Sequence, residues 1–165
     1  MKKADVLSKM DQTIQQIQKG AFLTVQADGR RNTMTIGWAA LGICWRKPVF
    51  MIAVRNSRYT YEIIEKAKDF TVTLPGKNMQ DEIFYCGTKS GRDVDKFKEC
   101  ELKTAAAQEV ASPIIDTPGM HIECKIVYKT AMDPANLDKA FESLYPDKDY
   151  HTLYFGEVVA CYEKA

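Results

Sequence analysis

The sequence lacks the features that would place the protein in a membrane or outside the cell. No run approaches the roughly 18 consecutive apolar residues that a membrane span requires. The first residues, M-K-K-A-D-V-L, contain no hydrophobic secretion core. We therefore expect a cytoplasmic protein without a membrane partner. Its length of 165 residues predicts a single domain over residues 1–165.

An excess of charge of either sign is also absent. The 23 lysines and arginines nearly balance the 22 aspartates and glutamates, so the formal net charge is only +1. A protein whose main partner is a nucleic acid usually carries a strong basic field. We therefore expect no nucleic-acid partner.

Metal and disulfide patterns are missing too. The cysteines stand at positions 44, 86, 100, 124 and 161, an odd number with wide spacing and no C-x-x-C pair. With only two histidines in the chain, a zinc site would have to be assembled from distant segments. The spacing therefore predicts reduced, mostly buried thiols and no metal centre.

Motifs for catalysis by side chains are equally scarce. The sequence contains no G-x-G-x-x-G, no G-x-S-x-G, no H-E-x-x-H and no cluster of carboxylates. His121 falls within an alternating strand pattern and His151 follows Tyr150 in an expected loop, so both histidines are interpreted as structural. If the protein is an enzyme, a bound cofactor must carry the chemistry.

Hydrophobic periodicity predicts the elements that are present. Residues 5–19 place Val6, Met10, Ile14 and Ile17 on one helical stripe. Residues 21–38 form a hairpin that turns at D-G, positions 28 and 29. The other expected elements are strands at 48–54, 69–75, 121–130 and 152–163, a helix at 57–68, short helical pieces within 77–100, and a helix that begins at Asp133-Pro134.

These elements predict the fold class. Six or seven strands are joined partly by hairpins, and strand and helix do not alternate in a sustained way. This order disfavours a doubly wound parallel sheet. It favours a mainly β, mostly antiparallel small barrel with peripheral helices.

One junction gathers cations and hydroxyls. In V-R-N-S-R-Y-T, Arg55, Ser57, Arg58 and Thr60 surround the expected start of a helix. Free backbone N–H groups at a helix start, with hydroxyls and guanidinium groups nearby, suit a phosphate. The alternative is an ordinary surface helix with Ser57 as its cap and two solvated arginines. The residues alone leave both interpretations open.

Two further segments have the composition of a ligand site. N-T-M-T-I-G-W-A-A-L-G-I-C-W, residues 32–45, combines amide, hydroxyl, glycine and tryptophan, which would suit a planar aromatic ligand with a polar edge. G-T-K-S-G-R-D-V-D-K-F, residues 87–97, has the turn chemistry of an anion-holding loop but not the spacing of a Walker A motif. The alternatives are a pair of core strands and a solvated surface loop.

Together with W-R-K-P-V-F and D-F-T-V-T-L-P, these segments occur in an order that resembles the flavin reductase-like, flavoredoxin-type family of FMN-binding split-barrel proteins. The matching motifs cover about 80 residues in the middle of the chain. The resemblance implies a split β-barrel homodimer with FMN bound near the subunit interface.

The resemblance also implies site residues. Asn32, Thr33, Met34, Thr35 and Trp38 would line the isoalloxazine, with the two threonines near its polar edge and the methionine and tryptophan close to the ring. The phosphate and ribityl end would be held by Arg55, Ser57, Arg58, Tyr59 and Thr60, and the site closed by Ser90, Gly91, Arg92 and Lys96.

The implied activity is reduction of flavin by NAD(P)H. Reduced nicotinamide would deliver hydride to flavin N5, and the electrons would pass to free flavin, another small acceptor or a redox partner protein. Two alternatives remain. The protein could be an electron carrier that does not oxidise nicotinamide, or a non-redox module that binds haem or another planar ligand.

Overall fold

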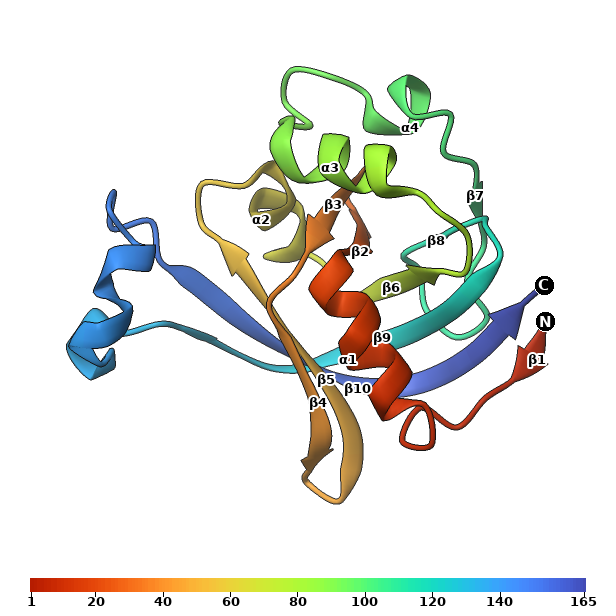
Figure 1. The fold of residues 1–165 in the computed structure, drawn as a ribbon, viewed down its shortest axis with the longest axis horizontal. Coiled ribbons are helices and arrows are strands. Elements are labelled where there is room, and N and C mark those ends of the chain that lie inside the picture. Colours follow the sequence, from red (N-terminus) through yellow and green to blue (C-terminus); the bar gives the residue numbers. More distant parts are fainter.

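The structure is a computed structural model that describes residues 1–165, and its main component is an antiparallel sheet (Figure 1). Seven strands follow one another in the order β3-β2-β6-β9-β10-β5-β4, and β1 pairs with β10. The strands are β1 (Lys2–Lys3), β2 (Ala21–Ala27), β3 (Arg30–Ile36), β4 (Ala39–Cys44), β5 (Lys47–Arg55), β6 (Asp69–Pro75), β7 (Thr104–Ala105), β8 (Ile114–Ile115), β9 (Gly119–Ala131) and β10 (His151–Lys164). The prediction of a mainly β, mostly antiparallel fold is confirmed.

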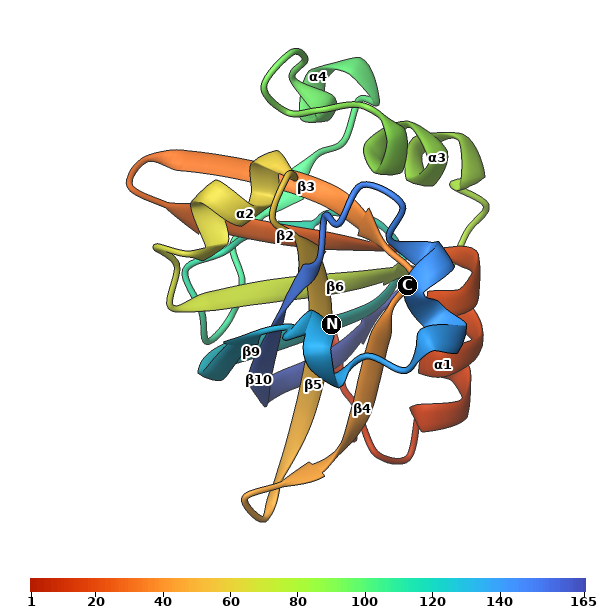
Figure 2. The same ribbon diagram turned by 90° about the vertical axis from the view of Figure 1, so that its left-hand side faces the viewer.

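The helices are short and lie around the sheet. They are α1 (Met10–Lys19), α2 (Tyr59–Ile64), α3 (Gln80–Thr88) and α4 (Lys96–Glu99), with 3₁₀ turns at Pro134–Asn136 and Lys139–Leu144. Figure 2 shows α2, α3 and α4 together at one end of the barrel. None of the helices combines the length and the apolar character needed to cross a membrane.

The β2–β3 hairpin forms where the sequence predicts it. Its two turn residues, Asp28 and Gly29, have φ angles of 50° and 71°. A two-residue turn with positive φ at both positions matches the twist of the strands on either side. The register then pairs Val25 with Asn32 and Leu23 with Met34 across the hairpin.

A second hairpin was not predicted. β4 pairs with β5 through a two-residue turn in which Trp45 and Arg46 have φ angles of 50° and 61°. β4 is an edge strand and none of its residues is buried, so its pattern lacks a clear alternation. The turn has no glycine or asparagine, which removed the usual hairpin signal.

Three helix predictions need correction. α1 begins at Met10 rather than residue 5, and it buries Thr13 and Ile17 while Ile14 is 38% exposed. α2 ends at Ile64, four residues short of the prediction. The expected helix after Asp133 is replaced by the two 3₁₀ turns, although Asp133 does accept a capping hydrogen bond from the N–H of Ala135. Those turns bury no residue, so no apolar face stabilises an α-helix there.

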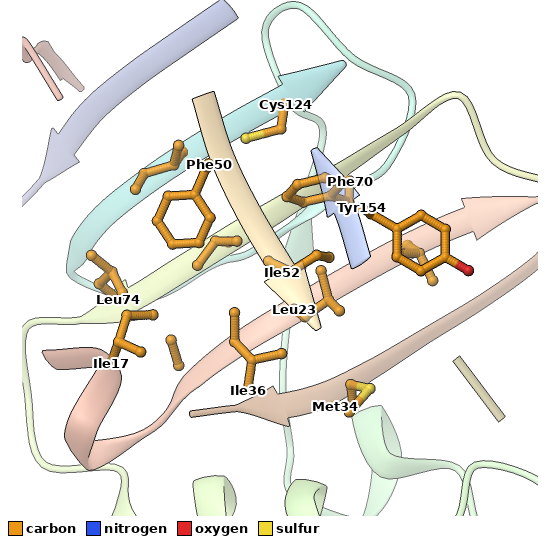
Figure 3. Close-up of a cluster of buried hydrophobic side chains, with 14 of the residues drawn as sticks. Ile17, Leu23, Met34, Ile36, Phe50, Ile52, Phe70, Leu74, Cys124 and Tyr154 are labelled. Atoms are coloured by element: carbon orange, nitrogen blue, oxygen red, sulfur yellow. The ribbon is translucent and has the colours of Figure 1, made fainter. Parts of the chain in front are cut away.

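Two hydrophobic clusters hold the fold together. The larger has 20 buried residues and fills the inside of the curled sheet, with Phe50, Phe70 and Tyr154 among its largest members (Figure 3). Burying one such side chain stabilises the fold by about 1.5–3 kcal/mol. The smaller cluster lies outside the sheet and consists of Phe22, Met79, Ile83, Cys86, Leu102 and Ile115. It seats α3 against β2 and β3, and so fixes the loop between α3 and α4.

The cysteines are all free thiols. Cys86, Cys124 and Cys161 are buried, Cys100 is half-buried and Cys44 is exposed. Burial raises the pKa of Cys86 and of Cys161 to about 12, so both are protonated at neutral pH.

Candidate functional site

Three segments far apart in the sequence meet at the end of the barrel that carries α2 and α3. They enclose a cavity of about 120 Å³. Ten of the fourteen predicted site residues line it: Asn32, Met34, Ser57, Arg58, Tyr59, Thr60, Ser90, Gly91, Arg92 and Lys96. Cys86, Thr88 and Lys89 complete the wall. The structure thus brings the junction after β5 and the loop after α3 to one place.

Lys96 is a buried cation in this wall. Its side chain comes from the first residue of α4, and only 3% of the residue is exposed. The ammonium Nζ donates to two backbone carbonyl oxygens, those of Thr33 at 3.1 Å and Cys86 at 2.7 Å. Burial lowers the pKa of Lys96, and the charge of Arg58 lowers it further. No carboxylate of the chain compensates this charge.

Arg58 is a second cation without an anionic partner. It follows β5, immediately before α2, and is half-buried at the cavity. Its guanidinium makes no hydrogen bond and no ion pair within the chain, although an arginine side chain carries five N–H donors. Two cations that face one small cavity without a counter-ion are suited to an anionic ligand.

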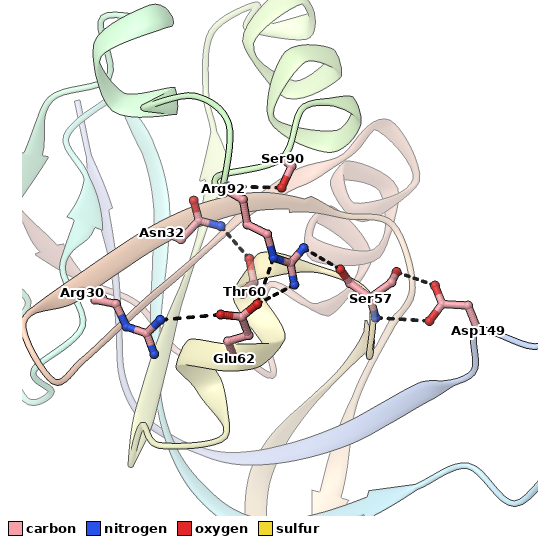
Figure 4. Close-up of polar contacts among 8 residues, drawn as sticks. All are labelled: Arg30, Asn32, Ser57, Thr60, Glu62, Ser90, Arg92 and Asp149. Carbon is pink, nitrogen blue, oxygen red and sulfur yellow. Dashed lines mark hydrogen bonds and ion pairs between the residues drawn. The ribbon is translucent and has the colours of Figure 1, made fainter.

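Arg92, in contrast, has an anionic partner within the chain (Figure 4). Its Nε and one terminal nitrogen donate to Glu62 Oε1 at 2.9 and 2.6 Å, and the other terminal nitrogen donates to the carbonyl oxygen of Ser57 at 2.9 Å. The second carboxylate oxygen of Glu62 lies 3.6 Å from Arg30. Arg92 therefore joins the loop after α3 to α2, and Glu62 already compensates its charge.

Ser57 does not cap the helix, so the alternative interpretation of this junction, an ordinary helix capped by Ser57, is wrong on that point. Its backbone N–H donates to Asp149 Oδ1 at 3.2 Å and its hydroxyl donates to Asp149 Oδ2 at 2.5 Å (Figure 4). The N-cap of α2 is Arg58, whose side chain makes no capping bond. With only six residues, α2 has a small dipole, so the positive character of the site comes mainly from Arg58 and Lys96.

Four predicted site residues lie outside the cavity lining. Thr33 is fully buried, and its hydroxyl donates to the carbonyl of Leu23. Thr35 donates to the carbonyl of Ile83 and so ties β3 to α3. Both hydroxyls are already bonded within the protein.

The other two, Arg55 and Trp38, belong to a neighbouring aromatic group. Arg55 donates to the carbonyl oxygens of Leu144 and Asp149 and lies over the ring of Tyr145. Trp38 is 44% exposed, and its ring centroid lies 4.8 Å from that of His151. These contacts anchor the segment before β10 beside the site.

His151 is a neighbour of the site that the sequence placed in a loop. It is the first residue of β10 and is 6% exposed, and its Nδ1 lies 2.8 Å from the hydroxyl of Tyr145. Burial, together with the nearby charge of Arg55, lowers the pKa of His151 to about 4. The ring is therefore neutral at pH 7. The sequence did not identify Glu62, Asp149 or His151 as neighbours of the site. Their partners, in the same order, are Arg92, Ser57 and Trp38, which lie 30 to 113 residues away in the sequence, so no local pattern indicates these contacts.

A larger cavity, about 790 Å³, lies elsewhere, where the end of α2 meets β9 and β10. Glu65, Tyr154 and Lys129 form a hydrogen-bonded chain at its wall. None of the fourteen predicted residues lines this cavity. The smaller cavity is the better candidate site, because it alone has a buried cation and a half-buried cation that lack counter-ions.

The structure is an antiparallel barrel with a cation-lined cavity at its peripheral helices, and the comparisons with known proteins agree with this fold. The chain belongs to the flavin reductase like domain family, whose sequence model matches residues 18–165. The predicted family and the predicted split-barrel fold are both confirmed.

Two solved structures and one sequence relative illustrate the likeness. The flavoredoxin of Methanosarcina acetivorans is 25% identical, with a TM-score of 0.69, over 88% of this chain and 68% of the other. An FMN-binding protein from Thermus thermophilus, solved with bound 1-cyclohex-2-enone, is 22% identical, with a TM-score of 0.69, over 87% of this chain and 69% of the other. An uncharacterized protein of Archaeoglobus fulgidus is 23% identical over 138 residues, which is 84% of this chain and 68% of that protein.

Proposed function

We propose that the protein binds FMN as a redox cofactor, accepts electrons from NAD(P)H and passes them to free flavin or another small acceptor. The observation that carries this proposal is the pair of cations without counter-ions, Arg58 and Lys96, at one cavity. Membership of the flavin reductase like family and the FMN-binding protein of Thermus thermophilus support the choice of ligand.

The residues present fit the phosphate end of FMN. The cavity of about 120 Å³ is smaller than the roughly 300–1,000 Å³ of a pocket for a whole cofactor, so it would take one end of the molecule. A phosphate monoester carries about 1.5 to 2 negative charges at pH 7, which would neutralise Arg58 and Lys96. Ser90 on the loop and Lys89 beside it supply further donors at the wall.

When bound, a flavin supplies hydride transfer and electron storage. The side chains of this protein have the simpler task of holding and orienting that group. Met34 lines the cavity from β3, and Lys96 fixes the wall by bridging the backbone of β3 and α3. No side-chain acid is required for hydride transfer, and His151, which is neutral at pH 7, is free to pack against Trp38.

We also propose that the protein is a homodimer. Ile43, Trp45, Val127 and Tyr128 are large apolar residues between 47% and 63% exposed. Trp45 and Tyr128 have ring centroids 6.1 Å apart and both contact Phe155. Exposed apolar patches of this kind are typical of association surfaces. Sedimentation equilibrium should show a dimer that Trp45→Glu dissociates; a monomeric wild-type protein would contradict the proposal.

The electron-carrier alternative is favoured by the likeness to the flavoredoxin of Methanosarcina acetivorans. It would use the same residues for FMN but would not oxidise nicotinamide. An absorption spectrum separates the two functions. If the flavin band bleaches when NADH or NADPH is added without oxygen, the protein is a reductase; if the band persists, the carrier function is supported.

Arg58→Ala tests the ligand assignment directly. It should weaken FMN binding by about 1.5–3 kcal/mol, the magnitude of a charge-assisted hydrogen bond, and weaken riboflavin binding far less. Arg46→Ala, in the exposed β4–β5 turn, is the matched control and should change neither affinity. Fluorescence titration measures both ligands. Equal losses for FMN and riboflavin would contradict phosphate binding by Arg58.

A further inference from the structure

A second cavity, of about 340 Å³, lies directly beyond the candidate phosphate cavity. It is lined by Arg31 of β3, by Tyr59 of α2 and by residues 91–97. Five residues line both cavities and separate them: Asn32, Tyr59, Gly91, Arg92 and Lys96. We call these five residues the partition.

The geometry points to the partition as the feature that makes the site select a flavin mononucleotide over a flavin dinucleotide. This inference rests on the proposed function, because it names which flavin the same site accepts. FMN ends at one phosphate, whereas FAD continues from that phosphate to a second phosphate and an adenosine. The partition is the wall that the inner and the outer cavity share.

The partition is closely packed at Gly91. A β-carbon at this position would lie 2.4 Å from Asn32 Oδ1 and 2.6 Å from Tyr59 Cδ1, both too short for a non-bonded contact. Asn32 is itself fixed, because its side-chain amide donates to the hydroxyl of buried Thr60 at 2.8 Å. The backbone of the loop therefore packs directly against Asn32 of β3 and Tyr59 of α2.

Arg92 holds the loop in this position. Its three hydrogen bonds, to Glu62 and to the carbonyl of Ser57, bridge the outer side of the partition, and its guanidinium lies 5.7 Å from the ring of Tyr59. The side chain of Arg92 is 43% exposed, so these bonds add little to overall stability. Their effect is geometric: the loop opens only if Arg92 leaves both partners.

Charge at the outer cavity does not add to this selection. Asp93 and Asp95 line it, but Arg31, Arg92 and Lys96 line it as well. The inference therefore rests on the close packing of the partition and not on the charge beyond it.

Equilibrium titrations of the full chain with FMN and with FAD test the inference. We expect the wild type to bind FMN at least about 100-fold more tightly than FAD, and Arg92→Ala to reduce this ratio at least tenfold, by opening the partition. Glu62→Gln should reduce it in the same direction. Arg30→Met removes the other cation on Glu62 without touching the partition, and should leave the ratio unchanged.

The FMN phosphate is a monoester with about 1.5 to 2 negative charges, whereas the corresponding phosphate of FAD is a diester with about one, so loss of the Arg92 cation lowers the ratio on charge alone. Glu62→Gln separates the two effects, because it removes a negative charge and would raise the ratio on charge alone, whereas opening of the partition lowers it. If Arg92→Ala does not fold, Glu62→Gln carries the test alone. Equal affinities of the wild type for FMN and FAD, or a ratio that neither variant changes, would overturn the inference and leave the proposed function intact. A change of the same size in Arg30→Met would also overturn it. If no flavin binds to the wild type, the proposed function itself fails.

Discussion

Charged side chains are buried in two regions of this molecule, and the two regions treat them differently. On β6 and β9, the carboxylates of Asp69 and Glu123 hold the segment of residues 106–113 by its backbone. Asp69 accepts from the N–H groups of Ala111 and Ser112 at 3.1 and 2.9 Å. Glu123 accepts from the N–H groups of residues 108 and 109 and from the hydroxyl of Tyr162, at 2.6 to 2.8 Å.

At the candidate site the charges lack such partners. The ammonium group of Lys96 donates only to two carbonyl oxygens, which carry partial charge, and the guanidinium of Arg58 has no partner in the chain. Leaving a buried charge uncompensated costs several kcal/mol in a protein interior. The difference separates two uses of buried charge: that of Asp69 and Glu123 is satisfied within the chain and serves the fold, whereas that of Lys96 is available to a ligand.

The largest expected effect comes from breaking the satisfied region. Glu123→Ala would leave two backbone N–H groups and the hydroxyl of Tyr162 without their acceptor. We expect the free energy of unfolding to fall by about 3–5 kcal/mol, as for a broken buried charge network. Urea denaturation measures this loss.

Tyr162→Phe is the matched control for Glu123→Ala, because it removes one donor and leaves the carboxylate with its other two. It should lower the free energy of unfolding by only about 1 kcal/mol. FMN affinity, measured where both variants are folded, should match that of the wild type. A loss below 1 kcal/mol in Glu123→Ala would contradict the assignment of this carboxylate to the fold.

His151 should produce the next largest effect, and it depends on pH. Its pKa is about 4 in the folded state and about 6.5 when unfolded, so the unfolded chain binds more protons between these values. Stability is therefore complete above about pH 6.5 and falls as the pH drops toward 4, by about 2–3 kcal/mol. Urea denaturation at several pH values measures the slope.

His151→Gln should remove most of this pH dependence. His121, whose pKa burial also lowers, contributes in the same direction in both proteins and cancels in the comparison. The charges of Arg55 and Arg58 add to the effect of burial, and both lower the pKa of His151 further. An identical slope in the wild type and the variant would show that His151 is not held neutral by the fold.

The distance along the chain between interacting residues explains which features the sequence could predict. The β2–β3 hairpin and β6 follow from periodicity and turn chemistry, which act over a few residues, and both were predicted. One of the two interpretations of the junction made Ser57 the cap of α2, yet its hydroxyl bonds to Asp149, 92 residues away. A capping pattern cannot reveal a competing acceptor so far along the chain.

Only part of the candidate site could be predicted, because some of its contacts join residues that are far apart in the sequence. The cation and hydroxyl cluster after β5 and the loop after α3 are local in sequence, and the structure brings both to one cavity. Thr33 and Thr35 have the right chemistry, but hydrogen bonds to Leu23 and Ile83 occupy their hydroxyls. The distinction between Arg92, which is paired, and Arg58, which is not, depends on the position of Glu62 in three dimensions and has no local signal.

Lys96→Met has the smallest expected effect and tests the comparison most sharply. Because burial lowers the pKa of Lys96, the fold disfavours its charge, and an apolar side chain of similar length should change stability by less than about 1 kcal/mol. FMN affinity should fall about tenfold, equivalent to 1.4 kcal/mol, and riboflavin affinity should change less. Lys98→Met, on the exposed side of α4, is the control. If Lys96→Met instead unfolds the protein as Glu123→Ala does and leaves FMN affinity unchanged, Lys96 belongs to the structural region, and the anion site depends on Arg58 alone.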